Sequence, residues 1–575
     1  MSDSAAPRSW RDDAGAAVGW VRHRITALSP RRSDFTAMRV SPRRDVLAGI
    51  TVGIVALPLA LAFGITSGLG AAAGLVTAIV AGTLAAIFGG SNLQVSGPTG
   101  AMTVVLVPIV AHYGVNGVLV VGLMAGVLLV VMAFAGAGRY VKFVPLPVIE
   151  GFTLGIAVII ALQQIPPALG EQAEGEQVLI SAGRAIGAWL ADPNWAPPAV
   201  AVAVAAVILA AIRVKPSVPV ALFAVAAATI AALAAHLDVA TIGELPSSLP
   251  LPSLPSLSWS DLRILAAPAV AVAALAALES LLSATVADAM SIDEHHDSDR
   301  ELFGQGVANL VSPLFGGIPA TAAIARTAVN VRSGASSRLA ALTHSFVLLL
   351  VVVLLGPIVA TVPLAALAGV LLATAARMVE VSNLRALVHS TRSDAAVLVV
   401  TFVATVVLDL ATAVILGIIV AGALALRHVA RSANLQATTL ASLDTAAPSD
   451  HVAQERELLH QHIVAYRFEG PLFFGGAHTA LLELTELSDV RVVILRMSHT
   501  TSLDVTGAAV LSDTIRDLER RGVAVLVSGL PHRFVPVLES RGCYQELSER
   551  GHLFDHTPDA IAAARAIVQD ARPVP

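Results

Sequence analysis

Residues 46–69 read VLAGITVGIVALPLALAFGITSGL, an apolar run that contains no charged side chain. A helix needs about 20 mostly apolar residues to cross the hydrocarbon core of a bilayer. This run is therefore long enough to be a transmembrane helix. The composition agrees with that interpretation, because 56% of the 575 residues are hydrophobic and only 13% are charged, whereas a typical soluble domain has about 25% charged residues.

Further apolar runs follow along the chain, and they predict a polytopic α-helical membrane protein. They cover residues 71–88, 115–138, 147–165, 199–212, 218–237, 264–290, 346–367, 395–410 and 411–426. Two other stretches, 96–110 and 310–331, are interrupted by glycine and proline and are too broken for ordinary spans. Such interruptions are typical of discontinuous helices that line a binding site at the membrane midplane.

The basic residues between these runs predict the orientation, because lysine and arginine concentrate in cytoplasmic loops. Residues 1–44 are polar and arginine-rich and lack the apolar core of a signal peptide, so we expect a cytoplasmic N-terminal tail. The C-terminus and the charged turn 288–301 are also predicted to be cytoplasmic. The acidic stretch 171–176 and the proline-rich loop 245–255 are predicted to lie outside. The basic residues expected inside are Arg43, Arg44, Arg139, Lys142, Arg213, Lys215, Arg300, Arg377, Arg385, Arg392, Arg427 and Arg431.

The character of the chain changes after about residue 430, which ends the predicted transmembrane domain of residues 45–430. A polar linker is expected over 431–461 and a small α/β domain over 462–570. Its predicted strands are 463–468, 490–497 and 523–528, and its predicted helices are 479–487, 506–521 and 560–569.

Three stretches resemble the sulfate permease (SulP) family of anion transporters. They are DVLAGITVGIVALPLALAFG at 45–64, QVSGPTGAMT at 94–103 and the segment 278–341, which begins LESLLSATVADAM. The resemblance implies fourteen transmembrane segments in two inverted repeats of seven, with short helices three and ten pointing their N-termini at a central anion site. The stretch SLDVTGAAVL at 502–511 resembles STAS domains, which often end these transporters.

The residues around Thr99 predict an anion-binding helix terminus. A helix that begins there leaves its first N–H groups unpaired and carries partial positive charge, which together favour an anion. Pro98 suits the first turn because it lacks an N–H group, and Gly97 and Gly100 allow an anion to approach the backbone. The alternative is a glycine-packed interface between membrane helices.

Two charged residues lie in apolar stretches, where charge is expensive and usually functional. The resemblance places Arg326 at the start of helix ten, facing the anion, and links Glu279 to a coupling ion. The alternatives are an arginine that extends to the interface and a glutamate in a structural ion pair. Ser283 lies on the same helical face as Glu279. The predicted substrate-binding residues are Phe63, Thr99, Gly100, Ala325 and Arg326, and the predicted coupling residues are Glu279 and Ser283.

Two departures from the family pattern concern the substrate and the coupling ion. Ile324 offers no side-chain oxygen where sodium-coupled relatives have a hydroxyl residue nearby, which disfavours a sodium site. Leu59 follows Pro58 where many members have glutamine. We therefore expect a proton-coupled symporter of sulfate, bicarbonate or a dicarboxylate, with sodium-coupled bicarbonate symport or anion exchange as alternatives.

The remaining signals are weaker. Thr506 occupies the hydroxyl position of STAS domains, where a phosphate would meet a helix N-terminus; the alternative is an ordinary helix cap. His295 and His296 lie in a charged turn rather than in a metal site, and no cofactor, metal or nucleic acid is expected. An intramembrane enzyme and a membrane anchor for the STAS domain are the competing functions. Homodimerisation, cytoplasmic partners of the STAS domain and a bacterial inner-membrane location are further expectations.

Overall fold

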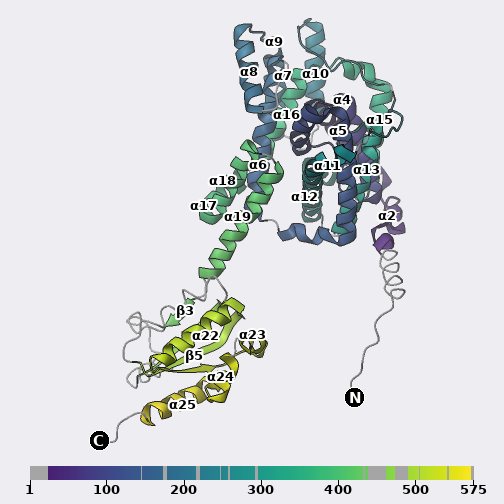
Figure 1. Cartoon of the computed structure of the whole chain (residues 1–575). Helices are drawn as coiled ribbons and strands as arrows, with labels where there is room; N and C mark the ends of the chain where they lie inside the picture. Colours follow the sequence, from purple (N-terminus) through teal and green to yellow (C-terminus); the bar gives the residue numbers. More distant parts are fainter. Residues whose placement is uncertain are drawn as a thin grey trace. The chain divides into compact units, whose positions relative to one another are not determined.

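A computed structural model provides the structure of the chain (Figure 1). The chain divides into two compact units, Met1–Ile418 and Ile419–Pro575, and each is described by itself. The described residues are 24–143, 145–171, 178–214, 220–246, 248–256, 259–291, 295–390, 392–408, 410–431, 434–437, 462–472, 490–503, 505–539 and 543–570.

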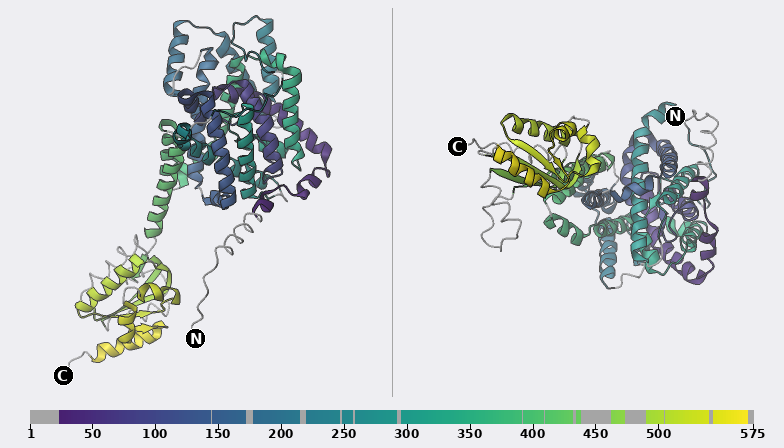
Figure 2. Two further views of the ribbon diagram at one scale, coloured as in Figure 1. Left: turned by 45° about the vertical axis from the view of Figure 1, so that its right-hand side comes forward. Right: turned by 90° about the horizontal axis from the view of Figure 1, so that it is seen from below.

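The first unit is helical, and its helices pack in two groups. The first group contains α3 (Pro42–Thr66), α4 (Ala71–Phe88), α5 (Gly100–Ala135), α12 (Ala266–Met290), α13 (Ser298–Val311), α14 (Ile324–Arg332) and α15 (Leu339–Ala360). The second group contains α6 (Leu146–Gln163), α7 (Ile165–Leu169), α8 (Val178–Ala191), α9 (Ala196–Val214), α10 (Val220–Ala234), α16 (Leu364–Met378), α17 (Val381–Ser390) and α18 (Arg392–Val407). The groups meet where α10 and α16 pack on α3 and where α5 packs on α6. Figure 2 shows the helices of this unit from two further sides.

Seven helical stretches among the described residues are long and apolar enough to cross a membrane, which agrees with the predicted polytopic architecture. They are Pro42–Thr66, Ala71–Phe88, Gly100–Ala135, Leu146–Leu169, Ala266–Met290, Leu339–Ala360 and Leu364–Arg385. Several large apolar side chains on them, such as Phe346, are exposed. An exposed apolar side chain is stable on a surface that faces lipid.

Helix α5 confirms the predicted break between a short helix and a full span. Its backbone leaves helical geometry at Gly114, where φ is 64°. This is a left-handed conformation that glycine adopts at little cost. The first part begins at Gly100 and the second ends at Ala135, close to the predicted stretches 96–110 and 115–138.

Two predictions about the helices were wrong in detail. The predicted span 346–367 is two elements, because α15 ends at Ala360 and α16 begins at Leu364 after Pro363, its N-cap residue. The predicted cytoplasmic turn 288–301 contains the first turn of α13, which begins at Ser298. Arg300 and Glu301 are buried there, whereas the sequence pattern favoured a solvated turn.

Part of the predicted N-terminal tail packs on the first unit. The short helix α2 (Arg32–Ala37) buries Asp34, which pairs with Arg300 and lies 3.9 Å from Arg338. Burial acts to raise the pKa of Asp34, but the hydrogen bonds from Arg300 and the Arg31 backbone outweigh it and hold the pKa below its usual range. This segment is therefore attached to the helices through a carboxylate that stays ionised at neutral pH.

The second unit contains the end of α19 (Leu410–Arg431) and a five-stranded sheet. Strand β3 (Asn434–Ala437) is antiparallel to β4 (Ile463–Leu472), and β5 (Val492–Leu503), β6 (Ala524–Ser528) and β7 (Leu553–Phe554) continue in parallel. Strand β3 therefore lies within the predicted linker 431–461. The predicted helix 479–487 lies outside the described residues.

Both faces of this sheet are covered, as expected for parallel strands. Val493 and Leu495 of β5 pack with Leu511 of α22 (Val505–Arg520) on one face. Val492 and Ile494 pack on the other face with α25 (Thr557–Asp570). Two short helices, α23 (Val535–Glu539) and α24 (Cys543–Glu549), complete the unit. The alternation along β5 gives the α/β domain that the sequence predicted.

Candidate functional site

The two broken segments of the first unit meet at a pair of very short strands. Strand β1 (Ser96–Gly97) and strand β2 (Thr321–Ala322) are antiparallel, with Ser96 opposite Ala322 and Gly97 opposite Thr321. Each strand leads directly into a helix, α5 after Thr99 and α14 after Ala323. Segments far apart in the chain thus bring two helix N-termini together, and both termini carry partial positive charge.

Thr99 links the start of α5 to the carboxylate of Glu279. Its Oγ1 accepts a hydrogen bond from the Met102 N–H at 3.4 Å and donates one to Glu279 Oε2 at 2.8 Å. The hydroxyl is therefore both a helix cap and the donor that orients the carboxylate. Glu279 lies in the second half of α12, within a membrane-spanning helix.

Arg326, in the first turn of α14, is 1% exposed and directs its guanidinium at the start of α5. Its Nη2 donates to the Pro98 carbonyl at 2.9 Å, whereas Nη1 has no hydrogen-bond partner among the described residues. A Cβ placed on Gly97 would lie 2.7 Å from Nη1, so a side chain at this position would displace the guanidinium. Arg326 and Glu279 are close enough to interact electrostatically. A buried cation with an unpartnered N–H is suited to hold an anion.

Phe63 and Gly100 meet beside this pair. A Cβ on Gly100 would lie 3.2 Å from Phe63 Cε1 and 2.4 Å from Ile160 Cδ1. Phe63 is nearly buried, at 6% exposed. Phe63 and Ile160 come from different helix groups, α3 and α6, so the two groups touch at the start of α5. Sequence reasoning did not identify Ile160, because an isoleucine in an apolar helix gives no signal of its own.

Ser283 and Ala325 take different positions from the rest of the predicted set. Ser283 donates to Thr327 Oγ1 at 3.0 Å, and Thr327 Oγ1 accepts from the Val95 N–H. This serine therefore joins α12 to α14 and has no hydrogen bond to Glu279 among those found in the described residues. Ala325 and Ile324 are exposed at the first turn of α14. The structure thus brings Phe63, Thr99, Gly100, Glu279 and Arg326 together, with Ala325 at an accessible edge.

Buried polar side chains that sequence reasoning missed hold the two broken segments in place. Asn309 Oδ1 accepts a hydrogen bond from the Ala320 N–H at 2.8 Å, and Asn309 Nδ2 donates one to the Ala320 carbonyl oxygen at 2.9 Å. Ser280 contacts Thr321, and Gln94 donates to the Ser280 carbonyl. Their common signal is a polar residue within a stretch of small apolar ones. Because buried polar groups need partners, these bonds fix the path of β1 and β2.

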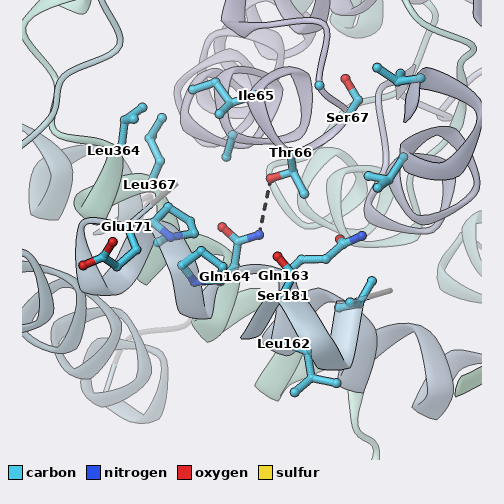
Figure 3. Close-up of a pocket in the computed structure, with 18 of the residues that line it drawn as sticks. Ile65, Thr66, Ser67, Leu162, Gln163, Gln164, Glu171, Ser181, Leu364 and Leu367 are labelled. Atoms are coloured by element: carbon cyan, nitrogen blue, oxygen red, sulfur yellow. Dashed lines mark hydrogen bonds between the residues drawn. The ribbon is translucent and has the colours of Figure 1, made fainter. Parts of the chain in front are cut away.

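A separate cavity of about 480 Å³ lies beside this site (Figure 3). It is lined by the end of α3, by α5 near Val110, by Gln163 at the end of α6 and Gln164 after it, and by α16. Gln164 Nε2 donates to Thr66 Oγ1 at 3.3 Å across it (Figure 3). The described lining includes Ala62, the neighbour of Phe63, but neither Arg326 nor Glu279. The cavity is thus adjacent to the candidate site and distinct from it.

Comparisons with known proteins identify the family to which the chain belongs. The Sulfate permease family model matches residues 43–401, and the STAS domain model matches residues 458–560. The chain belongs to the sulfate permease family. Members of this family are transporters and not enzymes.

The relatives span nearly the whole chain. The putative sulfate transporter YvdB of Bacillus subtilis is 37% identical over 89% of this chain and 96% of its own length. The bicarbonate transporter BicA of Picosynechococcus is 31% identical over 85% of this chain and 90% of its own length. The structure of SLC26A9 superimposes with a TM-score of 0.77 over 99% of this chain and 98% of that chain at 17% identity, which shows the shared fold.

Two other predicted features have a clear position. His296 Nδ1 lies 2.7 Å from Asp288 Oδ2 in a partly buried pair, and no group of three potential metal ligands occurs among the described residues. Thr506 is in the first turn of α22. Its side chain lies outside the described part, so its regulatory role stays a prediction.

Proposed function

We propose that this transporter carries a small oxyanion, sulfate or bicarbonate, by symport with a proton, with the anion held between Arg326 and the N-termini of α5 and α14. The observation that supports this most directly is the buried guanidinium, whose Nη1 has no partner among the described residues while two helix N-termini converge on it. Two helix termini and one guanidinium supply the positive potential that an anion needs in a low-dielectric site.

Glu279 supplies a physical link between proton and anion. When it is ionised, its charge compensates that of Arg326, and the anion competes with a carboxylate. When it is protonated, Arg326 is the remaining full charge of this pair, and the anion is attracted. Proton binding and anion binding therefore favour each other, and by linkage the two effects are equal in size. Acid on the side of uptake should drive accumulation.

Thr99 gives this link a direct geometry. The hydroxyl that caps α5 donates to Glu279 at 2.8 Å, so the charge on the carboxylate acts at the helix terminus that would hold the anion. Sodium-coupled bicarbonate symport is the second candidate, because a bicarbonate transporter is among the relatives. A sodium site would require several oxygen ligands, and Ile324 contributes none at the start of α14.

The test is uptake of labelled sulfate, bicarbonate and fumarate into proteoliposomes with an imposed pH step, with and without sodium. We expect acid-driven accumulation without sodium, and we expect Glu279→Gln to keep exchange but lose accumulation. Thr285→Val is the matched control, because it removes a hydroxyl of α12 whose bonds in the described structure stay within its own helix. Uptake that ignores the pH step and follows external sodium would refute proton coupling.

The remaining proposals concern assembly and regulation. We propose a homodimer in a bacterial inner membrane with both termini in the cytoplasm, and a regulatory role for the STAS domain through cytoplasmic partners. The proposed orientation is supported by the contacts of Asp299, in the turn predicted to be cytoplasmic, with Arg24 of the N-terminal tail and with Gly138, next to Arg139. Cysteine labelling from each side of intact cells, and cross-linking of the purified protein, test these two points.

A further inference from the structure

His344 of α15 is a buried histidine that the proposed transport mechanism does not use. The residue is 0% exposed. Its ring lies against α4, because a Cβ placed on Gly82 would be 3.9 Å from His344 Cε1 and 3.2 Å from the Ser96 carbonyl oxygen. The imidazole therefore lies behind β1, the strand that leads to Thr99.

The guanidinium of Arg326 lies near the same face of α4, on the other side of Gly97. A Cβ on Gly97 would lie 2.7 Å from Arg326 Nη1 and 3.3 Å from the Ala78 Cα atom. Ala78 and Gly82 are one helical turn apart, so they are neighbours on one face of α4. Arg326 is also the charged group that acts electrostatically on the His344 ring. The two groups thus lie near neighbouring residues of α4, and the guanidinium is close enough to act on the imidazole electrostatically.

Both groups have unused hydrogen-bonding capacity. The two ring nitrogens of His344 have no hydrogen-bond partner among the described residues, and the same is true of Arg326 Nη1. The ring is near the Ala341 carbonyl, one turn back on α15, although the geometry is short of a hydrogen bond. Buried donors and acceptors without partners are costly. A neutral imidazole that turns one N–H toward Ala341 has a lone pair on its other nitrogen.

We propose that His344 is a positioning residue for Arg326: its neutral imidazole accepts an N–H of Nη1, directly or through one water, when the anion is bound. Together with the Pro98 carbonyl on Nη2, this contact fixes the plane of the guanidinium. Each terminal nitrogen then keeps one N–H for the anion, because each carries two. The inference rests on the proposed anion site and adds a residue that sets its affinity.

The experiment measures equilibrium binding of labelled sulfate and bicarbonate to the purified full-length protein. His344→Leu removes the acceptor, and we expect affinity to fall about 10- to 100-fold, the range for one hydrogen bond to a charged group. His344→Gln retains an acceptor and should recover most of that loss. Ser345→Ala is the matched control, because Ser345 is the next residue, is similarly buried and bonds only the Ala78 carbonyl among the contacts found in the described residues. It should bind like the wild type.

A double-mutant cycle separates positioning from general packing. In an Arg326→Lys background the planar guanidinium is gone, so His344→Leu should cost less than about 3-fold. Wild-type affinity in a folded His344→Leu protein would overturn the inference. A loss that His344→Gln does not recover, or one that is undiminished in the Arg326→Lys background, would overturn it as well. If His344→Leu does not fold, His344→Gln keeps the inference falsifiable, because a folded His344→Gln protein with a large loss of affinity would overturn it. Failure of the wild type to bind either anion would instead refute the proposed function.

Discussion

Replacing Arg326 by alanine tests the proposed anion site most directly. The substitution removes the buried cation and leaves Glu279 beside Thr99 without a compensating charge. Two effects follow. The anion loses its charged donor, and an unpaired carboxylate is left in the core. The second effect lowers stability and would complicate any measurement of the first, so the companion variant Arg326→Ala/Glu279→Gln is required.

The magnitude follows from the hydrogen bonds of the guanidinium. The Pro98 carbonyl accepts one N–H of Nη2, and the proposed contact of His344 with Nη1 would leave one N–H of each terminal nitrogen for the anion. A hydrogen bond to a charged group contributes about 1.5–3 kcal/mol. Two such bonds, less some compensation by water, amount to about 3–4 kcal/mol, which is roughly a 10²–10³-fold loss of affinity.

The assay is labelled-sulfate binding to purified protein, with melting temperature measured in parallel. We expect both variants to lose affinity, and we expect the double variant to regain the stability that Arg326→Ala loses. Arg332→Ala is the control, because it removes an arginine from the last turn of the same helix. Near wild-type affinity in the double variant would refute the reasoning, since it would mean that Arg326 serves only to neutralise Glu279.

Three further predictions concern other parts of the chain. Gly100→Ala places a Cβ 2.4 Å from Ile160 Cδ1, so it should lower the free energy of unfolding by about 1–3 kcal/mol and slow transport, and Ile160→Ala should restore both. The control is Gly356→Ala, which should have no effect because its Cβ meets nothing within 4 Å in the described structure. A Gly100→Ala protein with unchanged stability and transport would contradict the close contact. Ending the chain after Arg431 should leave anion affinity unchanged but alter the transport rate or the expression level, since every proposed site residue of the transport domain precedes Arg431. Loss of anion binding in a folded truncated protein would contradict the independence of the STAS domain. Burial lowers the pKa of His552, so the unfolded state binds more protons, and the contribution of this residue to stability should be complete above about pH 6.5 and decline as the pH falls below that value. Hydrogen exchange of β6 in the full-length protein, measured between about pH 7.5 and about pH 5.5, tests this. Exchange free energies that do not change over this range would disprove it.

The sequence predicted the elements whose signals are local. Helix α4 has its predicted bounds, 71–88, because glycine flanks an apolar run at both ends. The break in α5 was predictable because a short apolar stretch with glycine and proline cannot be one straight span. The boundary between α15 and α16 was missed, since the apolar residues continue through it and Pro363 is its only mark. The burial of Arg300 and Glu301 depends on α2 and on α4, which are distant in the chain.

In the candidate site, too, some features were predictable from local sequence and others were not. Thr99, Glu279 and Arg326 were identifiable because each is polar or charged in an apolar context. Their mutual arrangement was not, because it depends on the register of β1 with β2, Ser96 opposite Ala322. Ile160 and His344 were missed for opposite reasons. The isoleucine resembles its neighbours, and the histidine lies in α15, in a stretch with no other sign of function.

The antiparallel pair of β1 and β2 also makes the two halves of the transport domain depend on each other. Each strand belongs to a different half of the chain, and each half supplies one short helix and part of the polar site: Thr99 from the first, and Glu279 and Arg326 from the second. A polypeptide of half the length would carry one strand with an open edge and an incomplete anion site. The candidate site is therefore complete only when both halves of the chain have folded and paired through β1 and β2.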